Sequence, residues 1–426
     1  MERFGSPLGH VTYALGMFHD VNPHVLPRIA RRTDSKILVV VMDGLGGAIG
    51  AGGPTALERA AHPNLDALAK AGALGRYVPI APGITPGSGP GHFALFGYDP
   101  LALEVGRGVL ETVGLGVDVH PGDVTARANF ATVDAQGRLT DRRAGRIPTE
   151  EAAPLARALA AAVGRIEDVA VEIHPGLQHR FALVLRGPGL DERVGDTDPQ
   201  REGVPASAPA ALHPAAEKTA RVIAEFVRRA SAFLRPQTKA NAVLLRGVSG
   251  RPALPTLPER ARLRPVAIAA YPAYLGVARL LGMDVAPGVT PKSTIADEVT
   301  ALERAWTGAY DFFFLHVKGT DSAGEDGDEA RKAKVIEEFD REVPRIVALK
   351  PDVILVTGDH STPGPMKGHS WHSVPFLLHG AWVEPDATTR FDEPSCAVGR
   401  FGGFFPALSL MPVVLACAGK LGKFGA

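Results

Sequence analysis

The strongest constraint on the fold is an unbroken apolar run, KILVVVM, at residues 36–42, which ends at Asp43 and the turn GLGG. A run of β-branched residues without polar alternation predicts a strand buried on both faces, as in parallel sheets covered by helices. Ligands of such sheets bind beyond the carboxyl ends of the strands. Asp43 is therefore a candidate ligand for a cation, and capping of the next helix is the alternative.

The same glycines raise the alternative of a dinucleotide-binding loop. That loop needs a third glycine where this chain has Ile49. A carboxylate directly before the first glycine, as at Asp43, would also lie close to a pyrophosphate. The sequence therefore favours a cation over a dinucleotide at this turn.

Two more apolar runs, DFFFLHV at 311–317 and DVILVT at 352–357, predict further buried strands. Between them, apolar residues recur at three- and four-residue spacing, which predicts an amphipathic helix with Asp328 as its N-cap. These apolar positions are Ala333, Ile336, Phe339 and Val343. Strand, helix and strand at this spacing form a βαβ unit, so the sheet is at least partly parallel.

A polar cluster follows each of these two strands. The first cluster places Lys318 beside three hard oxygen ligands on a glycine-containing turn: Asp321, Glu325 and Asp326. The second cluster contains Asp359, His360, His369 and His372. Mixed carboxylate and imidazole ligands suit Mn²⁺ or Zn²⁺ better than Mg²⁺ alone. A charged surface loop is the alternative for the first cluster, and structural histidines are the alternative for the second.

Ser88 lies in TPGSGPGHFALFGYDP (85–100), between two glycines. The glycines let the backbone turn sharply and expose the hydroxyl, although the strand–turn–helix context of the hydrolase nucleophile elbow is missing. No base adjoins Ser88, so a metal ion is its natural activator. A plain Gly/Pro turn, with His92 as a solvated residue, is the alternative. Because three polar clusters each follow a buried strand, they can meet at one sheet edge as a two-metal phosphoryl-transfer site.

The chain has 426 residues, which is long for a single core. Residues 113–262 differ in character from the rest, with strand-like pieces at 181–185 and 242–245 and an Ala-rich helix at 150–163. We predict a discontinuous core, 1–112 and 263–426, with a second domain inserted at 113–262. Residues 1–34 are interpreted as an N-terminal extension that packs on the body.

Composition excludes several classes of partner. Lys+Arg and Asp+Glu both number 46, so the zero net charge gives no reason to expect nucleic acid or an acidic membrane as a partner. The longest apolar stretch, 265–278, contains two prolines and is too short to span a bilayer. With only Cys396 and Cys417, and no apolar signal core at the N-terminus, we expect a soluble cytoplasmic protein.

Taken together, these motifs resemble the archaeal-type cofactor-independent (2,3-bisphosphoglycerate-independent) phosphoglycerate mutases of the alkaline phosphatase superfamily. The matching segments run nearly end to end: VVVMDGLGG, HPNLDALAKAG, GSGPGHFALFGYDP, GDVTARANFATVD, LTDRRAGRI, HRFALVLRG, YPAYLGVARLLGMDV, FFFLHVKGTD, VTGDHSTP, HSWHSVP and GKLGKFGA. The resemblance implies an α/β fold: an alkaline-phosphatase-like core with a mostly parallel central sheet and helices on both faces, plus an inserted smaller α+β domain that clamps the substrate.

The resemblance also implies a ligand set. Ser88 is the nucleophile that becomes phosphoserine. One divalent ion is held by Asp43, Ser88, Asp359 and His360, and the other by Asp321, residue 325 and His369. The family has histidine where this chain has Glu325, and an acidic residue where it has His372, so a compensating exchange of ligands is one hypothesis. We expect Mn²⁺ first, with Mg²⁺, Co²⁺ or Zn²⁺ as alternatives, and no 2,3-bisphosphoglycerate.

The implied reaction moves a phosphoryl group between O3 and O2 of glycerate in glycolysis or gluconeogenesis. Lys318 and the second metal balance charge on the phosphoryl group. The inserted domain closes over the substrate, a small phosphorylated hydroxy acid, and retains it. The expected substrate-binding residues are Arg127, Arg142, Arg143, Arg146, Arg180, Arg186, Arg246 and His92. Each arginine has a surface ion pair as its alternative, and a homo-oligomer is left open.

Three other functions compete with the mutase. A phosphatase or phosphodiesterase would share the metal ligands and lack the clamp. A homoserine kinase-like relative would keep the fold and change the acceptor. A non-enzymatic nucleotide-binding module would need no Asp–His pairs, and its binding would survive a chelator.

Overall fold

The computed structural model describes residues 24–50 and 52–425, which form two compact units. Among these residues, the first unit comprises 24–50, 52–104, Leu254–Tyr271 and 278–425, and the second comprises Val105–Ala253 and Pro272–Val277. Within the described residues, no helix has both the length and the apolar character needed to cross a membrane.

The first unit is built on an eight-stranded sheet with the order β10-β9-β11-β1-β12-β13-β2-β14. In this order the strands are β10 (Asp284–Val285), β9 (Pro265–Ile268), β11 (Phe312–Val317), β1 (Ile37–Met42), β12 (Val353–Thr357), β13 (Val374–Gly380), β2 (Ala73–Val78) and β14 (Phe401–Pro406). Only β13 runs antiparallel to its neighbours. The sheet is therefore mostly parallel, as the sequence predicts.

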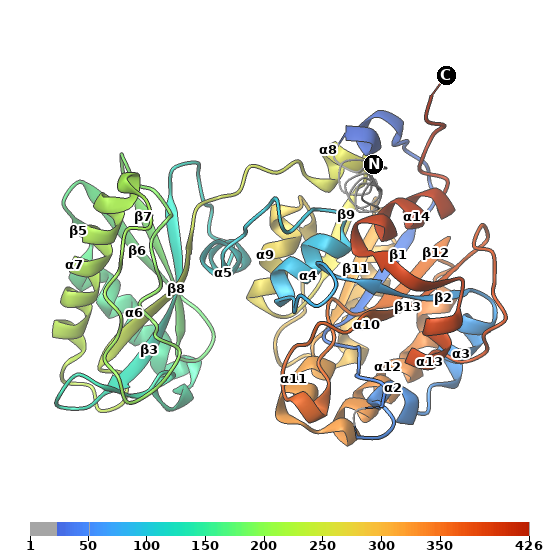
Figure 1. The fold of residues 1–426 in the computed structure, drawn as a ribbon. Coiled ribbons are helices and arrows are strands. Elements are labelled where there is room, and N and C mark those ends of the chain that lie inside the picture. The colour runs from blue at the N-terminus through green and yellow to red at the C-terminus, as the bar shows by residue number, and fades with distance from the viewer. Residues whose placement is uncertain (1–23, 51, 426) are drawn as a thin grey trace, which may run out of the picture. The chain divides into compact units, whose positions relative to one another are not determined.

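Helices cover both faces of this sheet (Figure 1). One face packs against α2 (Ala56–Arg59), α3 (Pro63–Lys70), α10 (Ile295–Trp306) and α12 (Glu329–Ala348). On the other face lies α4 (Ser88–Leu95), whose Phe96 C-cap packs edge-on to Phe314 with ring centroids 5.1 Å apart. The remaining helices are α8 (Leu257–Ala261), α11 (Gly319–Asp326), α13 (Glu393–Val398), α14 (Leu410–Cys417) and α9 (Pro272–Leu280), which has residues in both units.

The three predicted strands and the predicted helix between two of them are confirmed. All residues of β1 are buried, as its apolar sequence requires. Asp328 caps α12 by accepting a hydrogen bond from the backbone N–H of Arg331. Strand β1 lies between β11 and β12 and is parallel to both, so Met42 pairs with Val317 and Val41 pairs with Thr357. The chain therefore leaves three neighbouring strands at the same edge of the sheet.

The described part of the predicted N-terminal extension packs on the first unit, and residues 1–23 lie outside the described residues. Leu26 and Ala30 are each 4% exposed. The backbone N–H of Arg31 donates to the carbonyl of Lys420 at 2.7 Å. Residues 24–34 are thus held by the C-terminal segment of the chain.

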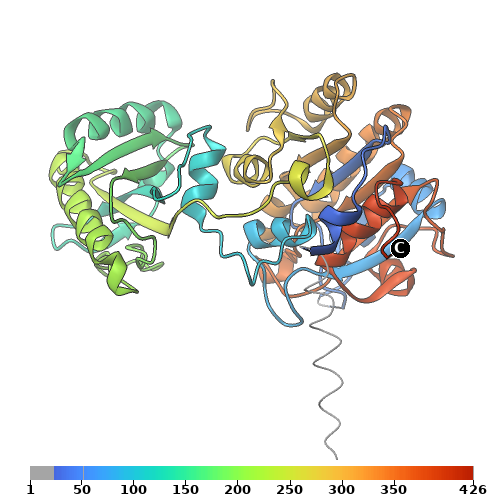
Figure 2. The same cartoon turned by 90° about the horizontal axis from the view of Figure 1, so that it is seen from above.

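The second unit contains a six-stranded sheet with the order β4-β3-β7-β6-β5 and β8 paired to β3. The strands are β3 (Val124–Val133), β4 (Leu139–Asp141), β5 (Arg165–Ile166), β6 (Val169–Pro175), β7 (Arg180–Arg186) and β8 (Ala242–Ser249). Helices α6 (Thr149–Val163) and α7 (Glu217–Leu234) lie on one face in both views (Figures 1 and 2). The predicted fold class, a mostly parallel α/β core with a smaller α+β part, is confirmed.

The opposite face of this second sheet carries α5 (Arg107–Gly114). A side chain at Gly108 would meet the carbonyl oxygens of Gly247 and Thr125 at 2.6 and 2.7 Å, so only glycine lets the helix approach this closely. The two faces of the sheet are therefore different. One is an apolar core beneath α6 and α7, and the other is free to carry polar side chains.

Glu298 of α10 leads to a prediction about stability. The residue is 5% exposed, its Oε2 accepts no hydrogen bond from the described residues, and burial together with Asp297 raises its pKa to about 8. Between the ordinary glutamate pKa of 4.5 and this raised value, the folded chain keeps a proton that the unfolded chain has lost. The free energy of unfolding should therefore fall as pH rises, by up to about 1.4 kcal/mol per pH unit.

Glu298→Gln should remove this dependence, because the amide resembles the protonated carboxyl group. In urea denaturation, we expect wild type and variant to have similar free energies of unfolding near pH 4.5, the ordinary glutamate pKa. The variant should become progressively more stable than wild type up to the raised pKa of about 8. A stability difference that is constant with pH would contradict the assignment.

Candidate active site

Two buried carboxylates form the centre of the candidate site. Asp43 follows β1 and Asp359 follows β12, and both side chains are fully buried. Oδ1 of Asp359 accepts a hydrogen bond from the backbone N–H of Gly44 at 3.0 Å, so the turn after one strand holds the carboxylate after the other. The parallel register thus brings together the two predicted ligands.

His360 and Ser88 complete the first predicted ligand group. Nε2 of His360 lies 3.3 Å from Asp43 Oδ1 and 3.2 Å from Asp359 Oδ2. The same nitrogen is 3.2 Å from the hydroxyl Oγ of Ser88, the first residue of α4. The three residues Asp43, Asp359 and His360 have ligand atoms close enough to hold one metal ion. The structure therefore places all four predicted residues in one cluster.

A second group adjoins the first. Asp321, His369 and His360 also have ligand atoms close enough to share a metal ion. Nε2 of His369 lies 3.6 Å from Asp321 Oδ1 and 4.0 Å from Glu325 Oε1, and its ring stacks on that of His360 at 3.6 Å. Glu325 is thus at the edge of this group, with its side chain 56% exposed.

The chemistry of the first group suits a cation. Asp43 Oδ1 and Asp359 Oδ2 are fully buried, and imidazole nitrogens approach them, from His360 at 3.3 and 3.2 Å and from His92 at 3.1 Å of Asp359. Burial of two carboxylates this close together is costly unless positive charge is present. Burial disfavours protonation of His360, yet the carboxylates of Asp359 and Asp43 outweigh it and raise its pKa to about 9. Carboxylates that draw a proton onto a neighbouring imidazole would also attract a divalent ion.

Lys318 supplies positive charge between the two groups. Its ammonium donates to Asp43 Oδ2 at 2.9 Å and to Asp321 Oδ2. Burial alone would raise the pKa of Asp43, but Lys318, His316 and His360 bring it well below its usual range. Asp43 is therefore ionised, as a metal ligand must be.

His92 corrects the predicted set of substrate-binding residues. The side chain is fully buried. Its Nδ1 lies 3.1 Å from Asp359 Oδ2 and 2.8 Å from the backbone carbonyl of Ser88. It packs one helical turn after Ser88, beneath that residue, because it is the fifth residue of α4. In this position His92 supports Asp359 and has no exposed surface for a substrate.

The segment expected to be a glycine-containing turn is instead helix α11. Helical spacing puts Asp321 and Glu325 one turn apart on the same face. Asp326 lies on a different face and pairs with Arg331 at 2.7 Å, so it is not part of the second group. The distinction between Glu325 and Asp326 could have been made from the sequence only if the helix had been recognised.

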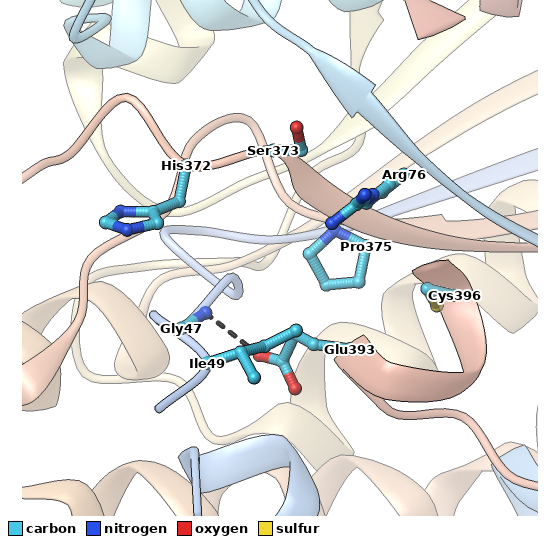
Figure 3. Close-up of a pocket in the computed structure, with 8 residues that line it drawn as sticks. All are labelled: Gly47, Ile49, Arg76, His372, Ser373, Pro375, Glu393 and Cys396. Carbon is cyan, nitrogen blue, oxygen red and sulfur yellow. Dashed lines mark hydrogen bonds between the residues drawn. The ribbon is translucent and has the colours of Figure 1, made fainter. Parts of the chain in front are cut away.

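His372 does not lie with the second group either. Its Nδ1 is 2.9 Å from the hydroxyl of Ser370, and its ring stacks on Trp371. It lines a cavity of about 120 Å³ together with Gly47, Ile49, Arg76, Ser373, Pro375, Glu393 and Cys396 (Figure 3). The hypothesis that His372 exchanges with Glu325 as a metal ligand therefore has no support in the geometry.

A second cavity, of about 320 Å³, lies within the second unit and is lined almost wholly by polar side chains. Its lining residues are Arg107, Arg127, Asn129, Arg142, Arg143, His179, Arg180, Gln200 and Arg246, and we call it the arginine pocket. Strand alternation explains its position. Val124, Ala126, Ala128 and Phe130 of β3 face the apolar core, so Arg127 and Asn129 point to the opposite face, where α5 lies.

Several polar atoms around the arginine pocket make no hydrogen bond to the described residues. They are the Nε atoms of Arg127, Arg180 and Arg246, Oδ1 of Asn129 and Nδ1 of His179. Burial and the adjacent Arg107 and Arg180 lower the pKa of Arg127 to about 10. Burial and the arginines around it lower the pKa of His179 to about 4. A pocket of crowded cations with unused donors is suited to an anionic ligand.

Two of the predicted arginines make fixed ion pairs. Arg142 lines the pocket, and its Nε and Nη2 both donate at 2.7 Å to the buried Asp198. Arg186 pairs instead with Asp123 and with Glu172 and is not a lining residue, which favours the alternative of an ion pair for this arginine. Arg146 is exposed and is not a lining residue, but its charge is among those that lower the pKa of His179, so its predicted role stays a prediction.

Sequence reasoning missed four lining residues: Arg107, Asn129, His179 and Gln200. Asn129 stands two residues after Arg127 on β3, so the two-residue alternation of a strand was a usable signal. Arg107 comes from α5, and Gln200 from the loop after Asp198. No sequence pattern indicates that these two segments fold onto one face of the sheet.

A serine at a helix N-terminus facing buried carboxylates and imidazoles, at the carboxyl edge of a mostly parallel sheet, is an arrangement typical of metal-dependent phosphoryl-transfer enzymes. A family model described as 2,3-bisphosphoglycerate-independent phosphoglycerate mutase matches residues 69–239. Probable enzymes of that name from Thermus thermophilus and Aquifex aeolicus are 48% and 47% identical to the chain, over 94% of it and 99% and 100% of the relatives. The chain belongs to the 2,3-bisphosphoglycerate-independent phosphoglycerate mutase family.

Solved structures agree with this membership. A cofactor-independent phosphoglycerate mutase from Thermoplasma acidophilum is 31% identical, with a TM-score of 0.66, covering 90% of this chain and all of the other. A protein from Pyrococcus horikoshii is 29% identical, with a TM-score of 0.78 over 93% of this chain and 100% of its own. Both similarities span the two units.

The arginine pocket should bind inorganic phosphate in metal-free protein and thereby raise the melting temperature. Arg180→Met removes a charged donor, so the apparent Kd for phosphate should rise about tenfold or more. The measurement is the phosphate-dependent shift of the melting temperature at constant ionic strength. Arg228→Met, on the exposed face of α7 where Arg228 pairs with Glu225, is the matched control and should leave the shift unchanged. An undiminished shift in Arg180→Met would exclude this pocket as the anion site.

Proposed function

We propose that this chain interconverts 3-phosphoglycerate and 2-phosphoglycerate through a phosphoserine at Ser88, as a step of glycolysis and gluconeogenesis. Family membership carries the overall reaction, which needs no 2,3-bisphosphoglycerate. The observation that supports the route is the contact of Ser88 Oγ with His360, which belongs to both ligand groups. The first unit acts as the metal-binding core and the second as the substrate clamp.

The proposed reaction has two transfer steps, and each forms one bond to phosphorus and breaks another. Ser88 Oγ bonds to phosphorus as the bond from phosphorus to O3 of glycerate breaks, and the proton lost by Ser88 goes to O3. In the return step O2 of the same glycerate bonds to phosphorus as the bond from phosphorus to Ser88 Oγ breaks, and the proton lost by O2 goes to Ser88 Oγ. Because Ser88 begins α4, its phosphoryl group is placed at a helix N-terminus, which favours anions.

The proposed ligands of one divalent ion are Asp43, Ser88, Asp359 and His360, and those of the other are Asp321, Glu325 and His369. When bound, the ions would lower the pKa of the Ser88 hydroxyl and neutralise the phosphoryl oxygens. We propose Mn²⁺, with Mg²⁺, Co²⁺ or Zn²⁺ as alternatives, because the set mixes carboxylates and imidazoles. Lys318 offers the phosphoryl group a further positive charge.

The arginine pocket is proposed to bind and retain glycerate. After the first transfer, glycerate keeps only its carboxylate charge, so retention depends on donors that are already in place. Arg127, Arg180 and Arg246 have unused Nε donors, which supports assigning them to the substrate. Arg142, Arg143 and Arg107 line the same cavity. We also propose a cytoplasmic location, which suits the two unpaired cysteines.

The decisive assay uses metal-stripped protein, 3-phosphoglycerate and added Mn²⁺, without 2,3-bisphosphoglycerate. Formation of 2-phosphoglycerate should depend on Mn²⁺ and fall by at least about a thousandfold in Ser88→Ala, because the nucleophile is lost. Release of inorganic phosphate in place of 2-phosphoglycerate would indicate a phosphatase. Full activity of Ser88→Ala would overturn the phosphoserine route.

Glu325 and His372 can be distinguished by metal content. Glu325→Gln should weaken the second ion by about ten- to a hundredfold or lose it, because a carboxylate ligand becomes neutral. His372→Gln should retain both ions, because His372 lines a different cavity. Metal per chain after gel filtration, measured by plasma mass spectrometry, separates these outcomes. Loss of metal in His372→Gln alone would reverse the assignment.

A further inference from the structure

Lys332 of α12 is a buried lysine in a helix whose other charged residues, apart from Asp340, are partly or fully exposed. Its side chain is fully buried. The ammonium Nζ donates hydrogen bonds to three backbone carbonyl oxygens, those of Gly44 at 2.7 Å, Gly46 at 3.1 Å and Thr362 at 3.0 Å. A lysine ammonium has three N–H donors, so every one of them is used. Burial of this charge is tolerable only because of these bonds.

The three carbonyls belong to the two loops that carry the proposed first ligand group. Gly44 and Gly46 follow Asp43 after β1, and Thr362 follows His360 after β12. The hydroxyl of Thr362 is 3.0 Å from His360 Nδ1 and donates to Asp321 Oδ1 at 2.8 Å. The two loops also bond to each other, from the N–H of Thr362 to the carbonyl of Gly46 at 3.0 Å. Lys332 therefore joins both loops where the ligands leave the sheet.

We propose that Lys332 is a positioning residue of the metal site, which fixes the loops of Asp43, Asp359 and His360 in the ligand geometry. The inference rests on the proposed metal-binding function. Without the ammonium, three inward-pointing carbonyls would lose a shared donor, and the loops would separate or recruit water. The ligand atoms would then have to be ordered at the moment of metal binding, which lowers affinity.

The positive charge of Lys332 affects metal affinity in the opposite direction to its positioning of the loops. Burial lowers its pKa to about 8 against the carboxylates of Glu329, Glu393, Asp321 and Asp43, so a positive charge persists near the site. By Coulomb's law alone, that charge would weaken the binding of a divalent ion. If only the charge of Lys332 mattered, its removal would tighten metal binding. If positioning matters more, its removal weakens metal binding, so the direction of the change tests the proposal.

The first test is a titration of the full chain with Mn²⁺, in which electron paramagnetic resonance measures the free ion. Lys332→Met keeps the length of the side chain without its charge or donors. We expect its apparent Kd to rise by about ten- to a hundredfold, the usual cost of losing a residue that orients metal ligands. Lys334→Met, two residues along on the exposed side of α12, is the control and should bind as wild type. Unchanged or tighter binding by Lys332→Met would overturn the proposal.

A second variant separates positioning from packing. In Lys332→Ala, added n-propylammonium should restore Mn²⁺ affinity, whereas n-propanol, which fills similar volume without the charge, should not. Equal rescue by both, or rescue by neither, would reduce Lys332 to a packing role. A variant that stays unfolded at saturating Mn²⁺ would assign Lys332 to the fold itself and also overturn the proposal. Failure of wild type to bind Mn²⁺ would instead refute the proposed metal site.

Discussion

Two negative charges buried side by side, on Asp43 and Asp359, are the constraint on which the first unit depends. Carboxylates in a low-dielectric interior repel each other and are costly to desolvate. Surrounding groups offset this cost. The N–H of Gly44 and the imidazoles of His92 and His360 contact Asp359, and the ammonium of Lys318 contacts Asp43. A site that concentrates negative charge in this way suits the divalent cations proposed above.

The sequence is informative where one physical rule dominates. The apolar runs ending at Asp43, Val317 and Thr357 predict adjacent buried strands, and parallel pairing then brings their ligands to one edge. Prediction fails where the outcome depends on tertiary packing. The burial of His92, the pairing of Arg186 with Asp123 and Glu172, and the approach of Arg107 to the arginine pocket all depend on which segments meet in space. The helical form of 319–326 was missed because its glycines suggested a turn.

The arginine pocket has the opposite electrostatic design to the metal site. Here positive charges are crowded, and their mutual repulsion adds to burial in lowering the pKa of Arg127. Asp198 holds Arg142 in a bidentate pair and lies 3.8 Å from Arg246, so buried acids offset part of the repulsion. Rotamers fixed in this way lose little entropy when an anion arrives. The second unit is therefore arranged to bind a small anion without rearranging its own side chains.

Retention of glycerate distinguishes a mutase from a phosphatase that uses the same serine. Once the phosphoryl group is on Ser88, glycerate must remain bound longer than it takes to turn and present its other hydroxyl. Each additional 1.4 kcal/mol or so of binding free energy extends that time about tenfold. Because a carboxylate is the only charge that glycerate still carries, the proposed mechanism assigns most of this binding to guanidinium groups such as Arg127, Arg180 and Arg246. In the proposed mechanism, the number of arginines in the pocket follows from the chemistry, because they would hold the weakly charged intermediate, for which binding is hardest to achieve.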